Sequence, residues 1–234
     1  MSAAEVKQKQ DQFMNELYSF FDRNYVTIKI NSKRLCHYFE MACYSRVLQY
    51  YRSQNFTIDT RSPHGNQKVF KFKSTTKGTP NNYSFFRVSR KLANSDKTRV
   101  YDIRSNMPVC SSFDNCIYIP DIVVSKASDK NDIEQIENRD LITFCEVKYL
   151  LPYPEMLANF IGTIHELTPD LLTGPVVREG LHPAPALMPS GHSSENVNQI
   201  SIGMKKRYTV NFAFHYDNNL AGSNDVKRIR GLYE

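Results

Sequence analysis

Two short apolar runs that contain ionisable residues constrain the fold of this chain more than any other feature. The first covers residues 117–124 and carries Pro120-Asp121, and the second covers residues 141–150 and carries Glu146-Val147-Lys148. Both runs are rich in β-branched and aromatic residues and are bounded by polar stretches, which is typical of β-strands. A charge in such a strand is costly unless it is paired, hydrogen-bonded or bound to metal. The two runs therefore predict neighbouring strands whose charged side chains share one site.

Side-chain alternation predicts how the charged residues are arranged on the two strands. It groups Glu146 and Lys148 with Ile142 and Phe144 on one face, and Asp121 with Ile117, Ile119 and Val123 on one face. If the strands are neighbours, two carboxylates and one ammonium meet at one point. Two carboxylates can hold Mg²⁺ or Mn²⁺, which polarises a phosphoryl oxygen and lowers the pKa of a bound water. A lysine beside the metal can orient that water or stabilise charge that develops on the phosphate.

These residues resemble the motif of the PD-(D/E)XK, or restriction-endonuclease-like, nuclease superfamily. Pro120-Asp121 matches the first half of that motif, and Glu146-Val147-Lys148 matches the second half. The resemblance implies that Asp121 and Glu146 bind the metal, that the backbone carbonyl of Val147 is a further ligand, and that Lys148 is catalytic. Similar nucleases often carry another acidic residue on the first core helix, and Glu40 is the matching position here. The alternative for Glu40 is an ordinary glutamate at the edge of a helix.

The tripeptide (D/E)-x-K is by itself a weak pattern, because it occurs three times in this chain. Glu5-Val6-Lys7 lies in a polar, helix-like segment, and Asp225-Val226-Lys227 follows a loop-like stretch. Only Glu146-Val147-Lys148 follows a Pro-Asp pair with a strand pattern around both. The alternative for this central pair is a buried salt bridge, or a strand whose charged face is solvated.

The whole chain of 234 residues has a formal net charge of +6. This positive charge is concentrated in one segment. Residues 61–101 contain ten Lys and Arg but a single acidic residue, Asp96. Aromatic residues alternate with these cations, which is the composition expected of a surface that binds phosphates and stacks on bases. The alternative is a solvated hairpin whose aromatic residues form its core face. The candidate nucleic-acid-binding residues are Lys68, Lys71, Lys73, Arg87, Arg90 and Lys91.

The predicted elements complete an α/β fold with one domain over residues 1–234. Helices are expected at 3–23, 32–51 (with Ser32 as its N-cap), from Pro154 onward, and at 194–207, and strands are expected near 25–30, 56–60, 69–73, 84–90, 99–104, 184–188 and 208–215. With the two motif strands, this order resembles the αβββαβ core of the same superfamily over about residues 32–215. The resemblance implies a mixed central sheet flanked by helices, with a basic β-rich insertion at about 61–104.

Other features narrow the class of protein. No apolar run approaches the ~20 residues that cross a membrane, and the N-terminus has no signal-peptide core, so we expect a cytoplasmic protein. Five cysteines without a C-x-x-C pair argue against a zinc ribbon. We therefore expect a Mg²⁺- or Mn²⁺-dependent endonuclease that cuts double-stranded DNA, such as a restriction or defence nuclease, and a homodimer if the target is palindromic. The alternatives are an RNA-cutting or DNA-repair nuclease of the same superfamily, a non-catalytic nucleic-acid-binding module with the same fold, and a small basic scaffold protein.

Overall fold

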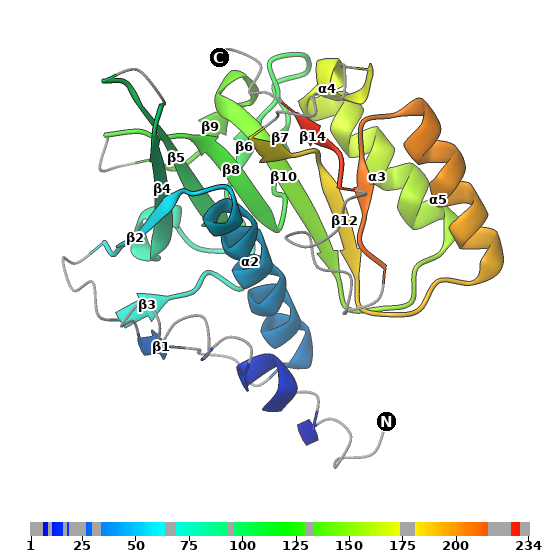
Figure 1. Ribbon diagram of the computed structural model, residues 1–234, viewed down its shortest axis with the longest axis horizontal. Coiled ribbons are helices and arrows are strands. Elements are labelled where there is room, and N and C mark those ends of the chain that lie inside the picture. The colour runs from blue at the N-terminus through cyan, green and yellow to red at the C-terminus, as the bar shows by residue number, and fades with distance from the viewer. Residues whose placement is uncertain are drawn as a thin grey trace.

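A mixed β-sheet with helices on both faces organises the chain (Figure 1). The computed structural model describes residues 7–8, 11–15, 18, 27–29, 34–63, 69–92, 96–129, 133–173, 181–214 and 226–229. This architecture confirms the prediction of an α/β protein with a mixed central sheet flanked by helices.

The central sheet has seven strands within the described ranges. In sheet order they are β13 (Asn211–Phe212), β12 (Ala186–Pro189), β10 (Leu141–Lys148), β8 (Ile122–Lys126), β5 (Thr98–Ser105), β4 (Phe85–Lys91) and β2 (Thr57–Arg61). From β10 to β2 the neighbouring strands are antiparallel, whereas β12 and β13 run parallel to β10. The strand with the Glu-x-Lys tripeptide, β10, therefore lies where the antiparallel and parallel parts of the sheet meet.

Within the described ranges, three small sheets accompany the central one. They are β1 (Thr27–Lys29) with β3 (Val69–Lys71), β7 (Ile117–Tyr118) with β6 (Val109–Cys110) and β9 (Ile136–Glu137), and β11 (His182–Pro183) with β14 (Arg228–Ile229). Two 3-10 turns, η1 (Pro80–Asn82) and η2 (Asn138–Asp140), connect neighbouring elements.

Helices cover both faces of the central sheet. The long helix α2 (Leu35–Ser53) packs on one face, and α3 (Pro154–Leu167) and α5 (Glu195–Arg207) pack on the other, with the short helix α4 (Pro169–Thr173) after α3. Alternation along β8 produces these two layers, because Ile122 and Val124 join the hydrophobic cluster under α2 while Val123 joins the cluster under α3. No helix in the described ranges is both long enough and apolar enough to cross a membrane.

The local signals for two of the helices hold in the structure. Pro154 occupies the first turn of α3, where its missing N–H has no intrahelical partner to lose, and the Ser194 hydroxyl caps α5 by accepting a hydrogen bond from the N–H of Val197. Helix α2 begins at Leu35, and the expected cap Ser32 lies outside the described residues. Of the helix expected at 3–23, residues 7–8, 11–15 and 18 are described and are helical.

The basic β-rich segment is not set apart from the sheet. We expected an insertion at about 61–104, but β4 and β5 from this range are internal strands of the central sheet. Their inward residues, such as Phe86 and Ile103, are buried under α2 in the same cluster as Tyr44. Burial of one face explains why the aromatic residues of this segment alternate with its cations.

The expected Pro-Asp strand is divided into two strands. Ile117 and Tyr118 form β7 in a small sheet, and the central sheet begins again only at Ile122 in β8. Pro120 separates them because it has no N–H to donate to a β-ladder. The prediction that Asp121 shares a face with Ile117 within one strand is therefore wrong, and Asp121 instead lies just before β8.

A register shift in β10 changes its predicted alternation. The pairing of β10 with β8 is irregular between Leu141 and Thr143. As a result Ile142 joins the cluster under α2, whereas Phe144 joins the cluster under α3. The prediction that Ile142 and Phe144 share one face is wrong, because an irregular ladder breaks the two-residue period.

Candidate active site

The ends of β8 and β10 bring the two motif halves together. The antiparallel register places Cys145 of β10 opposite Ile122 of β8. Glu146, which follows Cys145, is therefore next to Asp121, which precedes Ile122. The two motif segments are therefore neighbours, as the sequence predicts, even though Asp121 precedes its strand instead of lying within it.

Asp121, Glu146 and Lys148 form one hydrogen-bonded cluster. The Lys148 ammonium (Nζ) donates to Oε2 of Glu146 at 2.7 Å and to Oδ2 of Asp121 at 3.1 Å. The backbone N–H of Val147 also donates to Oδ2 of Asp121, at 2.7 Å. The side chains of Lys148, Asp121 and Glu146 are 39%, 19% and 16% exposed, so the cluster is accessible from solvent but largely enclosed.

Helix α2 adds Glu40 to this cluster. Glu40 is buried, and its Oε1 accepts a hydrogen bond from Nδ2 of Asn106 at 2.6 Å. Burial, and next the negative charge of Asp121, raise the pKa of Glu40 to about 8, although the Asn106 hydrogen bond and the charges of Lys148 and Lys73 oppose the shift. The charge of Asp121 thus acts on Glu40, which places all three predicted carboxylates in one electrostatic group.

Burial and neighbouring charges shift the pKa values of Glu146 and Lys148. Burial, and then the charge of Asp121, raise the pKa of Glu146 to about 7 despite the hydrogen bond from Lys148. Burial would lower the pKa of Lys148, but the charges of Glu146 and Asp121 outweigh it and raise that pKa above its ordinary value. Lys148 therefore keeps its charge beside two carboxyl groups, one of which, Glu146, ionises less readily than an ordinary glutamate.

The carboxylate oxygens of Asp121 and Glu146 are of the type that binds Mg²⁺. Within the described ranges no three His, Cys, Asp or Glu side chains are grouped so as to hold a metal ion. Asp121 and Glu146, however, already converge on one cation, the ammonium of Lys148. Mg²⁺ is commonly held by one or two carboxylates and takes its other ligands from water and substrate phosphate. Two convergent carboxylates therefore fit such an ion without a third protein side chain.

Asn106 is part of the cluster and carries no sequence motif. It follows β5, is 3% exposed, and contacts Glu40 through its side chain and Asp121 through its backbone, its N–H donating to the Asp121 carbonyl at 2.9 Å. Asparagine tolerates the left-handed backbone better than most residues, which makes an Asn after a strand a weak signal for such a position.

The structure does not place Lys73 on a surface that can bind nucleic acid. Its side chain is buried, with Lys73 only 1% exposed, and its ammonium donates to the carbonyls of Thr75 at 2.8 Å and Asn106 at 2.9 Å. Burial lowers the pKa of Lys73, and the charge of Glu40 opposes this shift. Lys73 is therefore a cation of the polar network beneath Glu40, and the prediction that it contacts phosphate is not supported.

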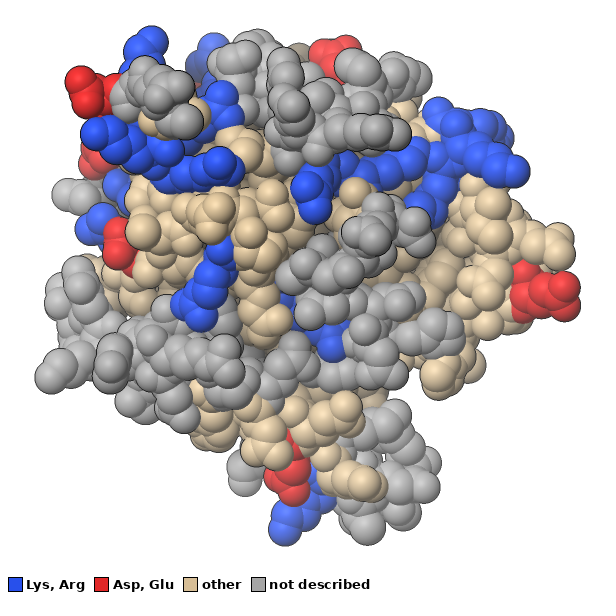
Figure 2. Space-filling view, in the orientation of Figure 1, with Lys and Arg blue, Asp and Glu red and all other residues tan. Residues whose placement is uncertain are grey.

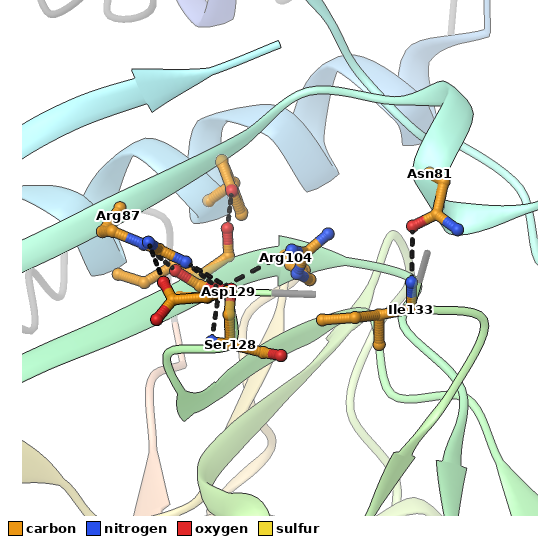
Figure 3. A network of polar contacts seen from close by, with 9 residues as sticks. Asn81, Arg87, Arg104, Ser128, Asp129 and Ile133 are labelled. Carbon is orange, nitrogen blue, oxygen red and sulfur yellow. Dashed lines mark hydrogen bonds and ion pairs between the residues drawn. The ribbon is translucent and has the colours of Figure 1, made fainter. Parts of the chain in front are cut away.

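Arg87 is also engaged within the protein. Its guanidinium donates to both carboxylate oxygens of Asp102, at 2.8 and 3.1 Å, and to the carbonyl of Ser128 at 2.7 Å, with Asp129 nearby (Figure 3). Asp102 is 1% exposed, so Arg87 neutralises a buried charge. This role explains a cation in β4 without a nucleic-acid partner.

The other predicted basic residues remain near the surface. The ammonium of Lys71 lies 5.0 Å from the ring centre of Tyr83, the guanidinium of Arg90 lies 6.0 Å from that of Phe56, and exposed Lys91 pairs with Asp96 at 3.3 Å. Lys68 lies outside the described residues. Lys and Arg gather over β4 and β5 at the upper left of Figure 2.

Arg90 and Lys91 lie at the opposite end of the central sheet from the carboxylate cluster. Lys91 is paired with Thr98 at the first residue of β5, whereas Ser105, the last residue of β5, is paired with Ile122 beside Asp121. The length of β5 therefore separates the β4–β5 turn from the cluster, and the structure does not bring Arg90 and Lys91 to the candidate active site.

Comparisons with models of known protein families, with curated proteins and with solved structures returned no match. The geometry of the site is thus the ground on which a function can be argued.

Proposed function

We propose that this protein is a metal-dependent endonuclease that hydrolyses phosphodiester bonds in DNA. The observation that carries the proposal is the convergence of Asp121, Glu146 and Lys148, with the ammonium of Lys148 within 3.1 Å of an oxygen of each carboxylate. Glu40 joins them from α2. Two convergent carboxyl groups and one lysine in a partly exposed cluster, with a third carboxyl buried within electrostatic reach, are kinds of group that metal-assisted phosphodiester hydrolysis uses.

The order of elements around the site supports the proposed membership of the PD-(D/E)XK superfamily. We take β2 and β4 as additions to the core. The remaining elements of the central sheet and its helices then follow in the order α2, β5, β8, β10, α3 and the parallel strand β12. This helix, three strands, helix, strand order is the one the sequence motif implies. Order alone is an analogy, so the chemistry rests on the cluster itself.

Each residue has a role in the proposed reaction. Asp121 and Glu146, with the backbone carbonyl of Val147, would hold Mg²⁺ or Mn²⁺. The metal supplies a polarised phosphoryl oxygen and a bound water of lowered pKa. Lys148 keeps its proton, because its pKa is raised, and so can orient the attacking water and stabilise negative charge on the phosphate. Glu40 lies within the electrostatic reach of Asp121 and sets how much negative charge the cluster presents.

A cleavage assay tests the proposal directly. Purified protein should cut double-stranded DNA in the presence of Mg²⁺ or Mn²⁺ and should not cut it in EDTA. Single-stranded DNA and RNA of the same sequence, run in parallel, separate a DNA endonuclease from an RNA-cutting member of the superfamily. Absence of cleavage of all three substrates at every metal concentration would reject the enzymatic function.

A second candidate function is a non-catalytic nucleic-acid-binding module with the same fold, in which the charged cluster is only structural. Lys148 bridges Asp121 and Glu146, and a salt bridge of this kind can stabilise strand ends without any metal. A binding module predicts DNA binding that is insensitive to EDTA and is not followed by cleavage. The same assay with a binding readout therefore separates the two functions.

For the place of action and the assembly, we propose the cytoplasm and a homodimer if the DNA target is palindromic. The symmetry of a two-fold target is matched most simply by two copies of one chain. Sedimentation of the protein with and without a palindromic duplex tests the assembly.

Removing Lys71, Arg90 and Lys91 together should weaken binding to DNA of any sequence. The slope of log affinity against log salt should also fall by about 0.9 for each phosphate that the protein no longer neutralises, because fewer counterions are released. The control is a variant without Lys205, Lys206 and Arg207 in the last turn of α5, which removes the same charge from another part of the molecule. Equal slopes for the two variants would show that net charge matters and that β4 and β3 carry no specific footprint.

A further inference from the structure

Asn106 uses its hydrogen-bonding groups to connect three separate parts of the chain. Its Nδ2 donates to Oε1 of Glu40 on α2 at 2.6 Å and to the carbonyl of Lys73 at 2.9 Å. Its backbone N–H donates to the carbonyl of Asp121 at 2.9 Å, and its own carbonyl accepts from the ammonium of Lys73 at 2.9 Å. Two of the residues it holds, Glu40 and Asp121, belong to the candidate active site.

The backbone of Asn106 is adapted to this position. Its φ angle is +49°, in the left-handed region that most residues with a side chain avoid. This conformation turns the chain at the end of β5, where Ser105 is still paired with Ile122. A residue held in a strained conformation, fully buried and bonded to two candidate site residues calls for a functional explanation.

Glu40 needs such a partner more than other acids do. Its carboxyl is buried, and the negative charge of Asp121 makes ionisation of Glu40 less favourable. Without a donor at Oε1 the carboxyl of Glu40 would have no hydrogen bond to hold it in this orientation beside Asp121. The amide of Asn106 supplies that donor, and its bond to the Asp121 carbonyl fixes the helix and the Pro-Asp turn relative to each other.

We propose that Asn106 is a positioning residue of the active site, which holds Glu40 beside Asp121, one of the two carboxylates proposed to bind a divalent cation. The inference rests on the proposed function, because it assigns Asn106 to the metal site of that enzyme. Asn106 itself does not touch the substrate or the metal.

Asn106→Gly is the variant that isolates this role. Glycine adopts a positive φ angle without strain, so the backbone turn is kept while the amide donor is removed. The expected result is at least a fivefold higher Mn²⁺ concentration for half-saturation, measured by calorimetric titration with the metal alone. Cleavage should need correspondingly more metal and should show a lower kcat, with the KM for DNA changed less than twofold.

A matched control and a second variant of Asn106 complete the experiment. Asn115→Gly is the matched control, because Asn115 also has a positive φ angle, +58°, but is exposed near the β6–β7 turn. It should bind Mn²⁺ and cleave DNA as the wild type does. Asn106→Asp keeps the shape of the side chain and tolerates the same backbone, yet it replaces the amide donor with a carboxylate oxygen, which cannot donate to Glu40. It should lose at least as much Mn²⁺ affinity as Asn106→Gly.

The outcomes separate this inference from the proposed function. Wild-type Mn²⁺ binding without cleavage would reject the nuclease and still test Asn106 through the titration. Wild-type cleavage together with unchanged Mn²⁺ affinity and unchanged kcat in both Asn106 variants would overturn the inference and leave the nuclease standing. A variant with lowered thermal stability but wild-type metal affinity would show that Asn106 is only structural, and a wild type that binds no Mn²⁺ would overturn the inference outright.

Discussion

Replacing Lys148 with alanine should lower the rate of DNA cleavage by about 10²–10³-fold, which is typical for the removal of one group that stabilises transition-state charge. DNA binding should change little, because a single lysine contributes only one of many phosphate contacts. The effect should therefore appear in kcat and not in the affinity for DNA. Single-turnover cleavage at saturating Mg²⁺, with a parallel binding titration, measures both quantities.

The same substitution should alter the carboxylates that Lys148 bridges. With the ammonium gone, Asp121 and Glu146 have no cation between them within the cluster described above. Thermal stability without metal should fall, and added Mg²⁺ should restore more of it than in the wild type. The control is Lys126→Ala, which removes a lysine on the neighbouring strand β8 whose partly exposed pair with Asp140 spans 3.5 Å. Wild-type cleavage by the Lys148→Ala protein would remove Lys148 from the reaction.

Replacing Glu40 with glutamine should make the protein more stable above neutral pH and change how stability depends on pH. The pKa of Glu40 is about 8 in the folded protein, above its ordinary value of 4.5, so the folded state binds this proton more tightly than the unfolded state does. The stability that this proton provides is complete below about pH 4.5 and is lost as pH rises through about 8. The wild type should therefore lose stability across this range relative to Glu40→Gln.

The size of the difference follows from the shift. Each pKa unit corresponds to about 1.4 kcal/mol, so the two proteins should diverge by a few kcal/mol between pH 5 and pH 8.5. Glutamine keeps the oxygen that accepts from Asn106, so the packing of α2 should not change. Urea unfolding at several pH values measures the divergence, with Glu134→Gln at an exposed position as control. Parallel pH profiles for wild type and Glu40→Gln would contradict the burial of this charge.

Glu40→Gln also tests the site itself. Glutamine cannot ionise when a cation binds, so the variant should need more metal for cleavage and should have a lower maximal rate. A Glu40 that served only in packing would leave both unchanged. A metal titration of the cleavage rate separates the two cases, and its result is independent of the stability measurement.

The sequence predicts the neighbouring motif strands because their signal is local. A run of β-branched and aromatic residues with a charge at its end reads as a strand whatever its distant contacts are, and β8 and β10 follow that pattern. The break at Pro120 was also readable, because proline cannot donate to a ladder, but the assignment of Ile117 to a different sheet depends on its pairing with β6. The register shift near Ile142 likewise depends on the partner strand and leaves no mark in a single chain.

The roles of the basic residues were not readable from the sequence. Lys71, Lys73, Arg87 and Arg90 come from one segment with one composition, yet two of them are buried or paired inside the protein. What separates them is the identity of distant partners, Asn106 for Lys73 and Asp102 for Arg87, which side-chain alternation cannot specify. The proposed role of Asn106 could not be predicted for the same reason. It depends on Glu40, 66 positions away in the chain, and on Asp121, 15 positions away.

If the protein is the proposed DNA endonuclease and the duplex runs along β5, the length of that strand sets how much DNA the protein would engage. β5 has 8 residues, so about 24 Å separates the β4–β5 turn from the Asp121 end at a rise of about 3.4 Å per residue. B-DNA also rises about 3.4 Å per base pair, so a duplex that touches both ends of the strand is gripped about seven base pairs to one side of the scissile phosphate. Cleavage would then fall near the edge of the protected region, and shortening the duplex on that one side would loosen its grip while leaving the cutting step intact.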